Sequence, residues 1–350
     1  MSASASEERV AWVDVCKGIC IVLVVYGHIA GGLETSGVFK VGSVFDRLRD
    51  WVYLFHIPAF FFLSGLFAHK AAERPFVPFL RGRLRVLFYP YLLWTGIILI
   101  SQMVVTSAVN TPASPTRALR CLWEPYGVGL WFLYSLFMIS LLSYGLRRLR
   151  LPTIAILLIG AVLFVLARRE VFGFWYILNE SMLHAIYFLI GACFPGVVAA
   201  PFRNARRSLL VAAGIGFFLV MTAAQILLPV DPNGAFKLVR ALLGIGGVVC
   251  VSMALARTAA LAPLAFLGAY SLEIYLAHPL WGTAARAVLL RSGIHAPLVF
   301  VLGAVSCGIA GSLAMALFCK RFNFPYLFRW PAKRRSAASS GISPDRAMAR

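Results

Sequence analysis

Long apolar segments, separated by short polar connections, are the dominant pattern of this chain. A helix needs about 20 apolar residues to cross the hydrocarbon core of a bilayer. Blocks of roughly this kind lie at residues 13–33, 51–68, 84–105, 129–146, 151–167, 172–197, 208–228, 236–256, 262–290 and 296–318. The pattern predicts an all-α fold, a polytopic membrane helix bundle with about ten transmembrane helices over residues 13–330. No connection is long enough for a separate domain.

Composition and charge support a membrane protein. Hydrophobic residues make up 61% of the chain and charged residues only 13%, against about 25% charged in soluble proteins. A net charge of +20 could indicate nucleic-acid binding, but the basic residues lie between the apolar blocks, which is typical of topology signals. With residues 1–12 in the cytoplasm, 21 of the 33 basic residues fall on the cytoplasmic side. We therefore expect a lipid bilayer and no nucleic acid as partner, and cytoplasmic termini with a basic, disordered tail at 331–350.

The first block carries three ionisable residues, Asp14, Lys17 and His28. Ionisable groups inside a membrane are costly and therefore indicate functional sites. Lys17 and His28 are eleven residues apart, so they share a helix face and lie about 16 Å apart along the axis. The alternative is that His28 is a satisfied core histidine and that Asp14 and Lys17 form an interfacial ion pair.

Two further polar features follow the first block. His56 precedes Pro58 in the second block, where the missing proline N–H frees a carbonyl one turn earlier and bends the helix. His56 then either lines the opened space or is structural. Arg81, Arg83 and Arg85 come next, and they serve either as topology signals or as a site for an anionic phosphate ligand. The cysteine spacings fit neither zinc nor a redox pair, so no metal is expected.

Taken together, five motifs resemble the membrane-bound acyltransferase-3 family, which includes O-antigen, exopolysaccharide and Nod-factor O-acetylases and fucose 4-O-acetylase-like proteins. They occur in family order as WVDVCKGICIVLVVYGH from Trp12, LFHIPAFFFLSGLF from Leu54, RGRLRVLFYPYLLW from Arg81, GLWFLYSLF from Gly129 and SLEIYLAHPL from Ser271. The family's Arg/Lys-x10-His motif corresponds to Lys17 and His28. Its basic Arg-x-x-Arg motif has only alternating arginines here.

The resemblance implies a bacterial inner-membrane O-acyltransferase that moves an acyl group, by family default acetyl, from cytoplasmic acyl-CoA to a hydroxyl of a glycan or lipid-linked saccharide. Acetyl-CoA would be a donor substrate, with no tightly bound cofactor. A sugar hydroxyl needs a general base, and a neutral His28 could take its proton. The expected catalytic residues are His28, Lys17 and Asp14, and the expected CoA-binding residues are Arg81, Arg83 and Arg85.

The expected substrate pocket contains His56, Ser64, Trp131, Glu273 and His278. Glu180 and His184 are four residues apart and so share a helix face. Such an acid–histidine pair either orients a catalytic group or only satisfies the hydrogen-bonding needs of its own two side chains. A transporter or flippase for a lipid-linked sugar, and a non-catalytic membrane scaffold, are the competing functions.

Overall fold

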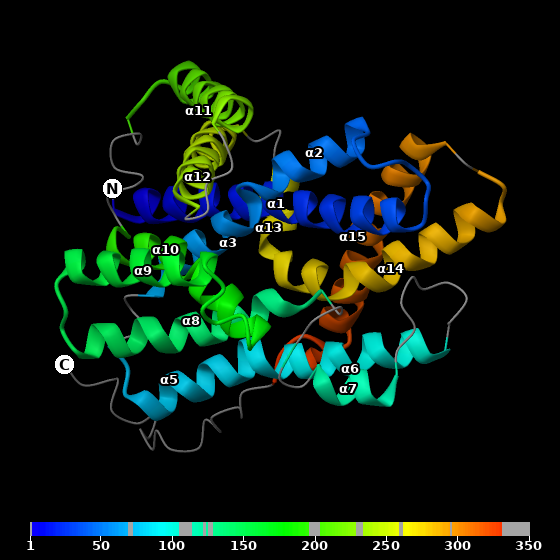
Figure 1. Cartoon of the computed structure of the whole chain (residues 1–350), viewed down its shortest axis with the longest axis horizontal. Coiled ribbons are helices and arrows are strands. Elements are labelled where there is room, and N and C mark those ends of the chain that lie inside the picture. Colours follow the sequence, from blue (N-terminus) through cyan, green and yellow to red (C-terminus); the bar gives the residue numbers. More distant parts are fainter. Residues whose placement is uncertain are drawn as a thin grey trace, which may run out of the picture.

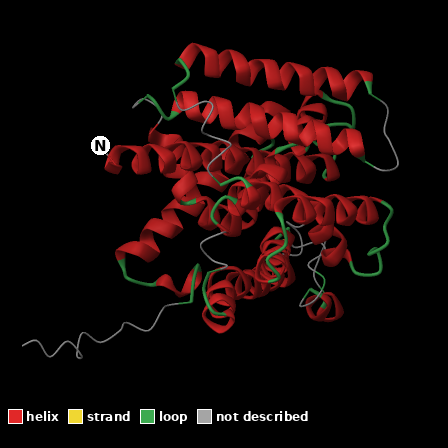
Figure 2. Ribbon diagram, turned by 90° about the vertical axis from the view of Figure 1, so that its left-hand side faces the viewer, coloured by secondary structure: helices red, strands yellow, loops and turns green. Residues whose placement is uncertain are grey.

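The chain forms a bundle of helices in a computed structural model that describes residues 2–68, 73–104, 114–121, 124, 129–195, 204–228, 234–258, 262–294 and 296–330. Figure 2 shows helices joined by loops, and no strand occurs among the described residues. The predicted all-α fold is confirmed. The tail at 331–350 lies outside the described residues.

Every predicted apolar block contains helix, and the boundaries differ by a few residues. In chain order the elements are α1 (Ser2–Thr35), α2 (Val44–Tyr53), α3 (His56–Gly65), α5 (Phe76–Arg83), the π-helical turn η1 (Leu84–Phe88), α6 (Tyr89–Val104), α7 (Pro115–Arg120), α8 (Trp131–Arg148), α9 (Thr153–Arg168), α10 (Tyr176–Cys193), α11 (Arg207–Leu227), α12 (Ala235–Leu255), α13 (Ala262–Ala269), α14 (Ser271–Arg291), α15 (Pro297–Arg321) and the 3-10 turn η4 (Pro325–Leu327).

Six helical stretches in the described part are long and apolar enough to cross a membrane: Ala11–Thr35, Phe76–Val104, Tyr176–Cys193, Arg207–Leu227, Ala235–Leu255 and Pro297–Arg321. Only 17% of the most apolar window of Arg207–Leu227 is buried in the protein. Apolar side chains on that helix, such as Leu219 and Ile226, are exposed. Such a surface is favourable against lipid and costly in water, so the bundle belongs in a membrane. The six stretches are counted among the described residues only, and the number of about ten transmembrane helices stays a prediction.

Helix α1 is the element around which the others pack. It contacts α2, α3, α12, α13, α14 and α15, and Figure 1 shows it between the α11–α12 pair and α14. Two glycines allow α13 to approach α1 closely. A Cβ on Gly18 would lie 1.9 Å from the Leu264 carbonyl oxygen, and one on Gly268 would lie 1.8 Å from that of Asp14. Small residues therefore bring α13 backbone-to-backbone against the start of α1.

Three expectations about helix boundaries need correction. The second block is two helices, broken around Leu54 and Phe55, because Pro58 cannot donate to the Leu54 carbonyl. The third helical span starts at Phe76 rather than at residue 84, so the three arginines lie on the helix itself. The ninth block is also two helices, divided at Tyr270.

The first helix begins before the apolar block. Residues 2–12 continue α1, which starts at Ser2. The ion pair expected near that end is present, with Lys17 Nζ 3.5 Å from Asp14 Oδ1.

Candidate functional site

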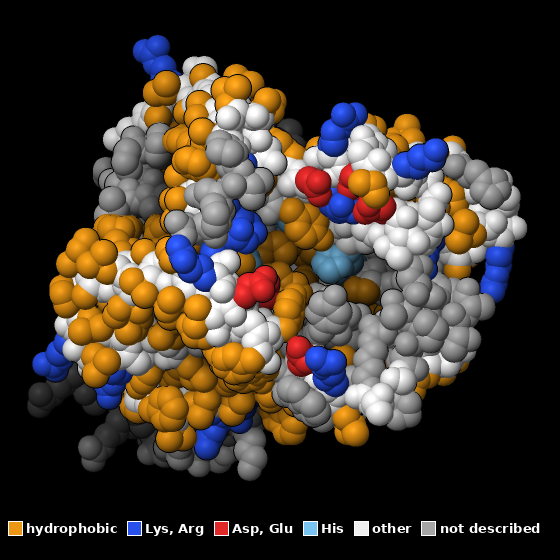
Figure 3. All heavy atoms as spheres, in the orientation of Figure 1, with side chains coloured by type: hydrophobic (Ala, Val, Ile, Leu, Met, Phe, Trp, Pro, Cys, Tyr) orange, Lys and Arg blue, Asp and Glu red, His pale blue; other side chains and the backbone are white. Residues whose placement is uncertain are grey.

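Two cavities meet at His28. The large cavity has a volume of about 920 Å³ and is lined by residues of α1, α2, α3, α8, α10, α11 and α12. The small cavity, of about 190 Å³, lies among α1, α6, α14 and α15. His28 lines both. From α1, both cavities are lined by residues between Gly27 and Thr35, so they reach His28 from the C-terminal half of that helix. Figure 3 shows a histidine at the base of a surface hollow.

The immediate neighbours of His28 come from two of the other motifs. A Cβ on Gly129 would lie 3.2 Å from Cε1 of His28, and Gly129 has a φ of +73°, a conformation that favours glycine. The hydroxyl of Tyr275 donates to the Gly129 carbonyl at 2.8 Å. On the same helix as Tyr275, His278 places its ring centroid 5.1 Å from that of His28, edge to face at 71°. Three distant motifs therefore converge on one imidazole.

His278 is held in one tautomer. Its Nδ1 lies 2.8 Å from the Tyr275 carbonyl oxygen and 3.0 Å from that of Ile274. Carbonyl oxygens only accept hydrogen bonds, so Nδ1 carries the proton, and Nε2 of the neutral ring presents a lone pair. The side chain is fully buried, and Nε2 has no partner among the described residues. The ring is thus a fixed hydrogen-bond acceptor at the wall of the small cavity.

Comparison with known protein families identifies the chain. The acyltransferase domain of family 3 matches residues 10–317. This chain belongs to acyltransferase family 3. No curated protein matches it, and no solved structure does. Membership makes it a multi-pass membrane acyltransferase, and the family domain includes both helices that carry the two histidines.

The large cavity of this acyltransferase is lined by aromatic and polar side chains. Trp131, which begins α8, packs its ring 5.2 Å from that of His184. His184 Nδ1 donates to the Glu180 carbonyl at 2.8 Å and lies 3.5 Å from the carboxylate of the same residue. The expected face-sharing pair is therefore formed. Tyr53 and Tyr187 add two more aromatic rings to the lining.

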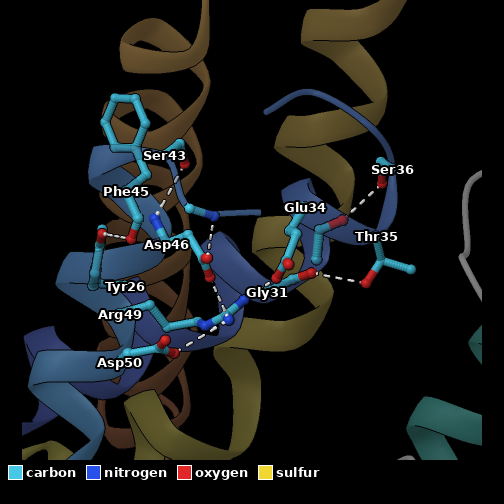
Figure 4. A network of polar contacts seen from close by, with 12 residues as sticks. Tyr26, Gly31, Glu34, Thr35, Ser36, Ser43, Phe45, Asp46, Arg49 and Asp50 are labelled. Carbon is cyan, nitrogen blue, oxygen red and sulfur yellow. Dashed lines mark hydrogen bonds and ion pairs between the residues drawn. The ribbon is translucent and has the colours of Figure 1, made fainter. Parts of the chain in front are cut away.

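A network of charges fastens α2 across the end of α1 (Figure 4). Arg49 pairs with Glu34 of α1 and with Asp46 at 2.5 Å and Asp50 at 3.3 Å on its own helix. Asp46 also accepts from the Gly42 backbone N–H at 2.7 Å. Four of these side chains form an interlocked cluster, which fixes α2 so that Asp50 and the guanidinium line the large cavity.

The proposed donor-binding residues lie apart from both cavities. Arg81 is exposed and Arg83 and Arg85 are half-buried, and none of them lines either cavity. Successive residues on a helix differ by about 100°, so Arg81 and Arg85 share a side and Arg83 faces away from them. The guanidinium of Arg83 stacks 5.5 Å from the Phe79 ring. Lys17 pairs with Asp14 and also lies outside the two cavities.

Of the five predicted pocket residues, two line a cavity and three do not. Trp131 lines the large cavity and His278 the small one. His56 is fully buried with Nδ1 2.7 Å from the Val52 carbonyl oxygen, Ser64 donates to the Phe60 carbonyl, and Glu273 lies in the first turn of α14. None of these three lines either cavity, although Ile57 and Pro58 beside His56 line the large one.

Several lining residues escaped sequence reasoning. They are Glu34, Arg49, Asp50, Tyr53, Gln225 and Lys237 in the large cavity and Gln102, Thr283 and Arg286 in the small one. Lys237 gave a usable signal, because a lysine three residues before Arg240 at the start of an apolar block is unusual in a membrane helix. The α2 charges appeared to be an ordinary polar connection.

Proposed function

We propose that this acyltransferase moves an acyl group, acetyl by family default, from cytoplasmic acyl-CoA to a hydroxyl of a glycan or lipid-linked saccharide, with His28 as general base. The observation that carries the proposal is the position of His28, which two cavities share at a place where three family motifs converge.

A single imidazole can accept the proton at the start of the reaction and return it at the end. A neutral His28 nitrogen takes the proton of the acceptor hydroxyl while the alkoxide oxygen attacks the thioester carbonyl. The carbon–sulfur bond then breaks, and the imidazolium returns the proton to the CoA thiolate. A base within hydrogen-bond reach contributes about 10²–10⁴-fold in rate.

His278 is suited to orient that base. Its fixed Nε2 lone pair can accept the N–H of His28, which leaves the other nitrogen of His28 unprotonated. The rings are already neighbours at 5.1 Å between centroids, and catalytic hydrogen bonds commonly tighten only when substrate is bound. His278 is therefore a positioning residue in this proposal.

The two substrates approach from opposite ends of α1. The cavities occupy its C-terminal half, which the predicted topology places outside the cytoplasm, so they suit the acceptor. The volume of about 920 Å³ lies within the usual 300–1,000 Å³ of ligand pockets, and the tyrosine and tryptophan rings can pack on sugar faces.

The donor would bind at the other end, where Arg81, Arg83, Arg85 and Lys17 can hold the phosphates of CoA. From Lys17 the thioester must advance about 16 Å along the helix to reach His28. The proposal therefore requires a path on the Lys17 face of α1 that opens when acyl-CoA binds.

Mass spectrometry of surface glycans tests the proposal. Glycans from cells that contain the gene should carry an acetyl group that is missing after deletion and returns with the wild-type gene but not with His28→Ala. Identical glycans in the two strains, together with sugar movement by the purified protein in liposomes without acyl-CoA, would instead establish a transporter.

A further inference from the structure

The two cavities that meet at His28 differ in size and in the helices that line them. Among the described residues, the helical span Phe76–Val104 contributes no side chain to the large cavity, whereas Gln102 of that span lines the small one. The same span carries the arginines to which the proposed function assigns the donor. Acyl transfer requires two substrates at one imidazole, so the small cavity is the one that adjoins the donor's helix.

Helices α1 and α14 form one wall of the small cavity. At its base the ring centroids of His28 and His278 are 5.1 Å apart. About one turn further along both helices, a Cβ on Gly282 would lie 2.4 Å from Cδ1 of Ile29. The absence of a side chain at Gly282 therefore keeps Ile29 on α1 and leaves space above the two histidines.

The Arg286 side chain crosses the far end of this wall. Its Nη1 donates to the Gly32 carbonyl at 3.3 Å and to the Ser36 hydroxyl at 2.6 Å, so it links α14 to α1. Gly32 is four residues after His28, which places the link about 6 Å along α1 from the imidazole. The small cavity therefore begins at two histidines and ends at a guanidinium.

The distance to Arg286 limits the length of a group that starts at His28. An extended carbon chain advances about 1.2 Å per bond, so beyond the carbonyl carbon a butyryl chain extends about 4 Å and an octanoyl chain about 8 Å. Only the butyryl chain ends before the guanidinium. The volume of about 190 Å³ agrees with this limit, because a cavity of about 150 Å³ holds the six carbons of benzene.

Polar groups in the walls also disfavour a long apolar chain. The side-chain oxygen of Gln102 is buried and has no hydrogen-bond partner among the described residues, and Thr283 lines the same cavity. An apolar chain that filled the cavity would exclude water from these groups, and an unpaired buried polar atom is costly. A short acyl group leaves space beside it for water, which needs only about 30 Å³ per molecule.

We propose that the small cavity binds the acyl chain of the donor and that Arg286 limits this chain to about four carbons. The acceptor hydroxyl then approaches His28 from the large cavity, and the thioester carbonyl lies between the two. The inference rests on the proposed function for the reaction, and it adds the residues that select the acyl group.

A series of donors tests the length limit. Protein in nanodiscs is given the acceptor glycan fraction with acetyl-, butyryl- or octanoyl-CoA, and kcat/KM is measured for each. We expect butyryl-CoA to be used within about tenfold of acetyl-CoA and octanoyl-CoA to be used about 100-fold less well, in the range by which pockets discriminate chain length.

Two substitutions change the cavity in opposite directions. Arg286→Ala removes the guanidinium and should raise the use of octanoyl-CoA relative to acetyl-CoA about tenfold or more. Gly282→Ala presses its methyl group on Ile29 at 2.4 Å, which narrows the cavity and should lower the use of butyryl-CoA relative to acetyl-CoA about tenfold. Arg291→Ala, which removes an exposed guanidinium from the last turn of the same helix outside both cavities, should leave both ratios unchanged.

Equal use of octanoyl- and acetyl-CoA by the wild-type protein would overturn the proposal. So would unchanged ratios in Gly282→Ala folded to the wild-type Tm, a result that stands even where Arg286→Ala fails to fold. Competition against labelled acetyl-CoA, without glycan and corrected for empty nanodiscs, separates this inference from the proposed function. A protein that transfers no acyl group but in which butyryl-CoA competes about tenfold better than octanoyl-CoA would keep the acyl pocket and overturn only the proposed function.

Discussion

Two substitutions of His278 separate the roles of its two ring nitrogen atoms, the backbone hydrogen bonds of Nδ1 and the acceptor that Nε2 presents. In His278→Asn the amide lies near the position of Nδ1, so it can still donate to the carbonyls at 2.8 and 3.0 Å. The acceptor that Nε2 presents toward His28 is lost. In His278→Gln the longer side chain carries an amide oxygen to about the place of Nε2, while the backbone hydrogen bonds weaken.

The structure sets the size of the effect. Without an acceptor beside it, the His28 ring can turn, and the rings are at present 5.1 Å apart between centroids. A misplacement of about 1 Å in a catalytic group can cost about 10²-fold in rate. We therefore expect His278→Asn to lower kcat about 100-fold with little change in KM. His278→Gln should recover part of this loss.

The assay is acetyl-CoA-dependent ester formation by protein in nanodiscs, with thermal unfolding measured in parallel. Ser252→Ala is the matched control, because Ser252 is also fully buried on a helix and donates to a carbonyl four residues earlier, but lines neither cavity. A kcat that follows Tm alone, with His278→Gln worse than His278→Asn and an unchanged pH profile, would refute the positioning role.

Two glycines give further predictions. Gly129→Ala should lower the rate of acyl transfer strongly and the stability only modestly. Its φ of +73° costs an alanine about 1–2 kcal/mol, and its methyl group would press on His28 at 3.2 Å. Normal transfer by a well-folded variant would contradict this. Gly268→Ala should prevent assembly, since its Cβ would lie 1.8 Å from the Asp14 carbonyl oxygen, and size-exclusion chromatography of detergent extracts would show aggregated protein. Gly96→Ala, which meets open space, should remain monodisperse, and equal behaviour of these two variants would contradict the packing argument.

The fold could be predicted because membrane helices leave a simple signal. Apolar length identifies each helix, since every backbone polar group in lipid must be satisfied within its own segment. What apolar length does not reveal is a break inside a block. The interruptions near Leu54 and at Tyr270 leave the hydropathy almost unchanged, so both blocks appeared continuous.

The site was predictable where ionisable residues occur inside apolar helices. His28 and His278 stand out for this reason, and both line the small cavity. The same criterion also selected His56, which is buried with its Nδ1 on a backbone carbonyl, because polarity in a helix does not show which way the helix faces. Arg49 lies in a short amphipathic helix between two apolar blocks, where charge is common, so only the fold shows that it borders the cavity.

The most direct measurement concerns the base itself. Purified protein is given acetyl-CoA labelled in the acetyl group and the glycan fraction that carries the acetyl ester in cells, and ester formation is compared with release of free CoA. We predict that the wild-type protein produces both in equal amounts and that His28→Ala, folded to the same Tm, loses at least 100-fold of each, in line with the contribution of a general base. Undiminished ester formation by His28→Ala would contradict the account.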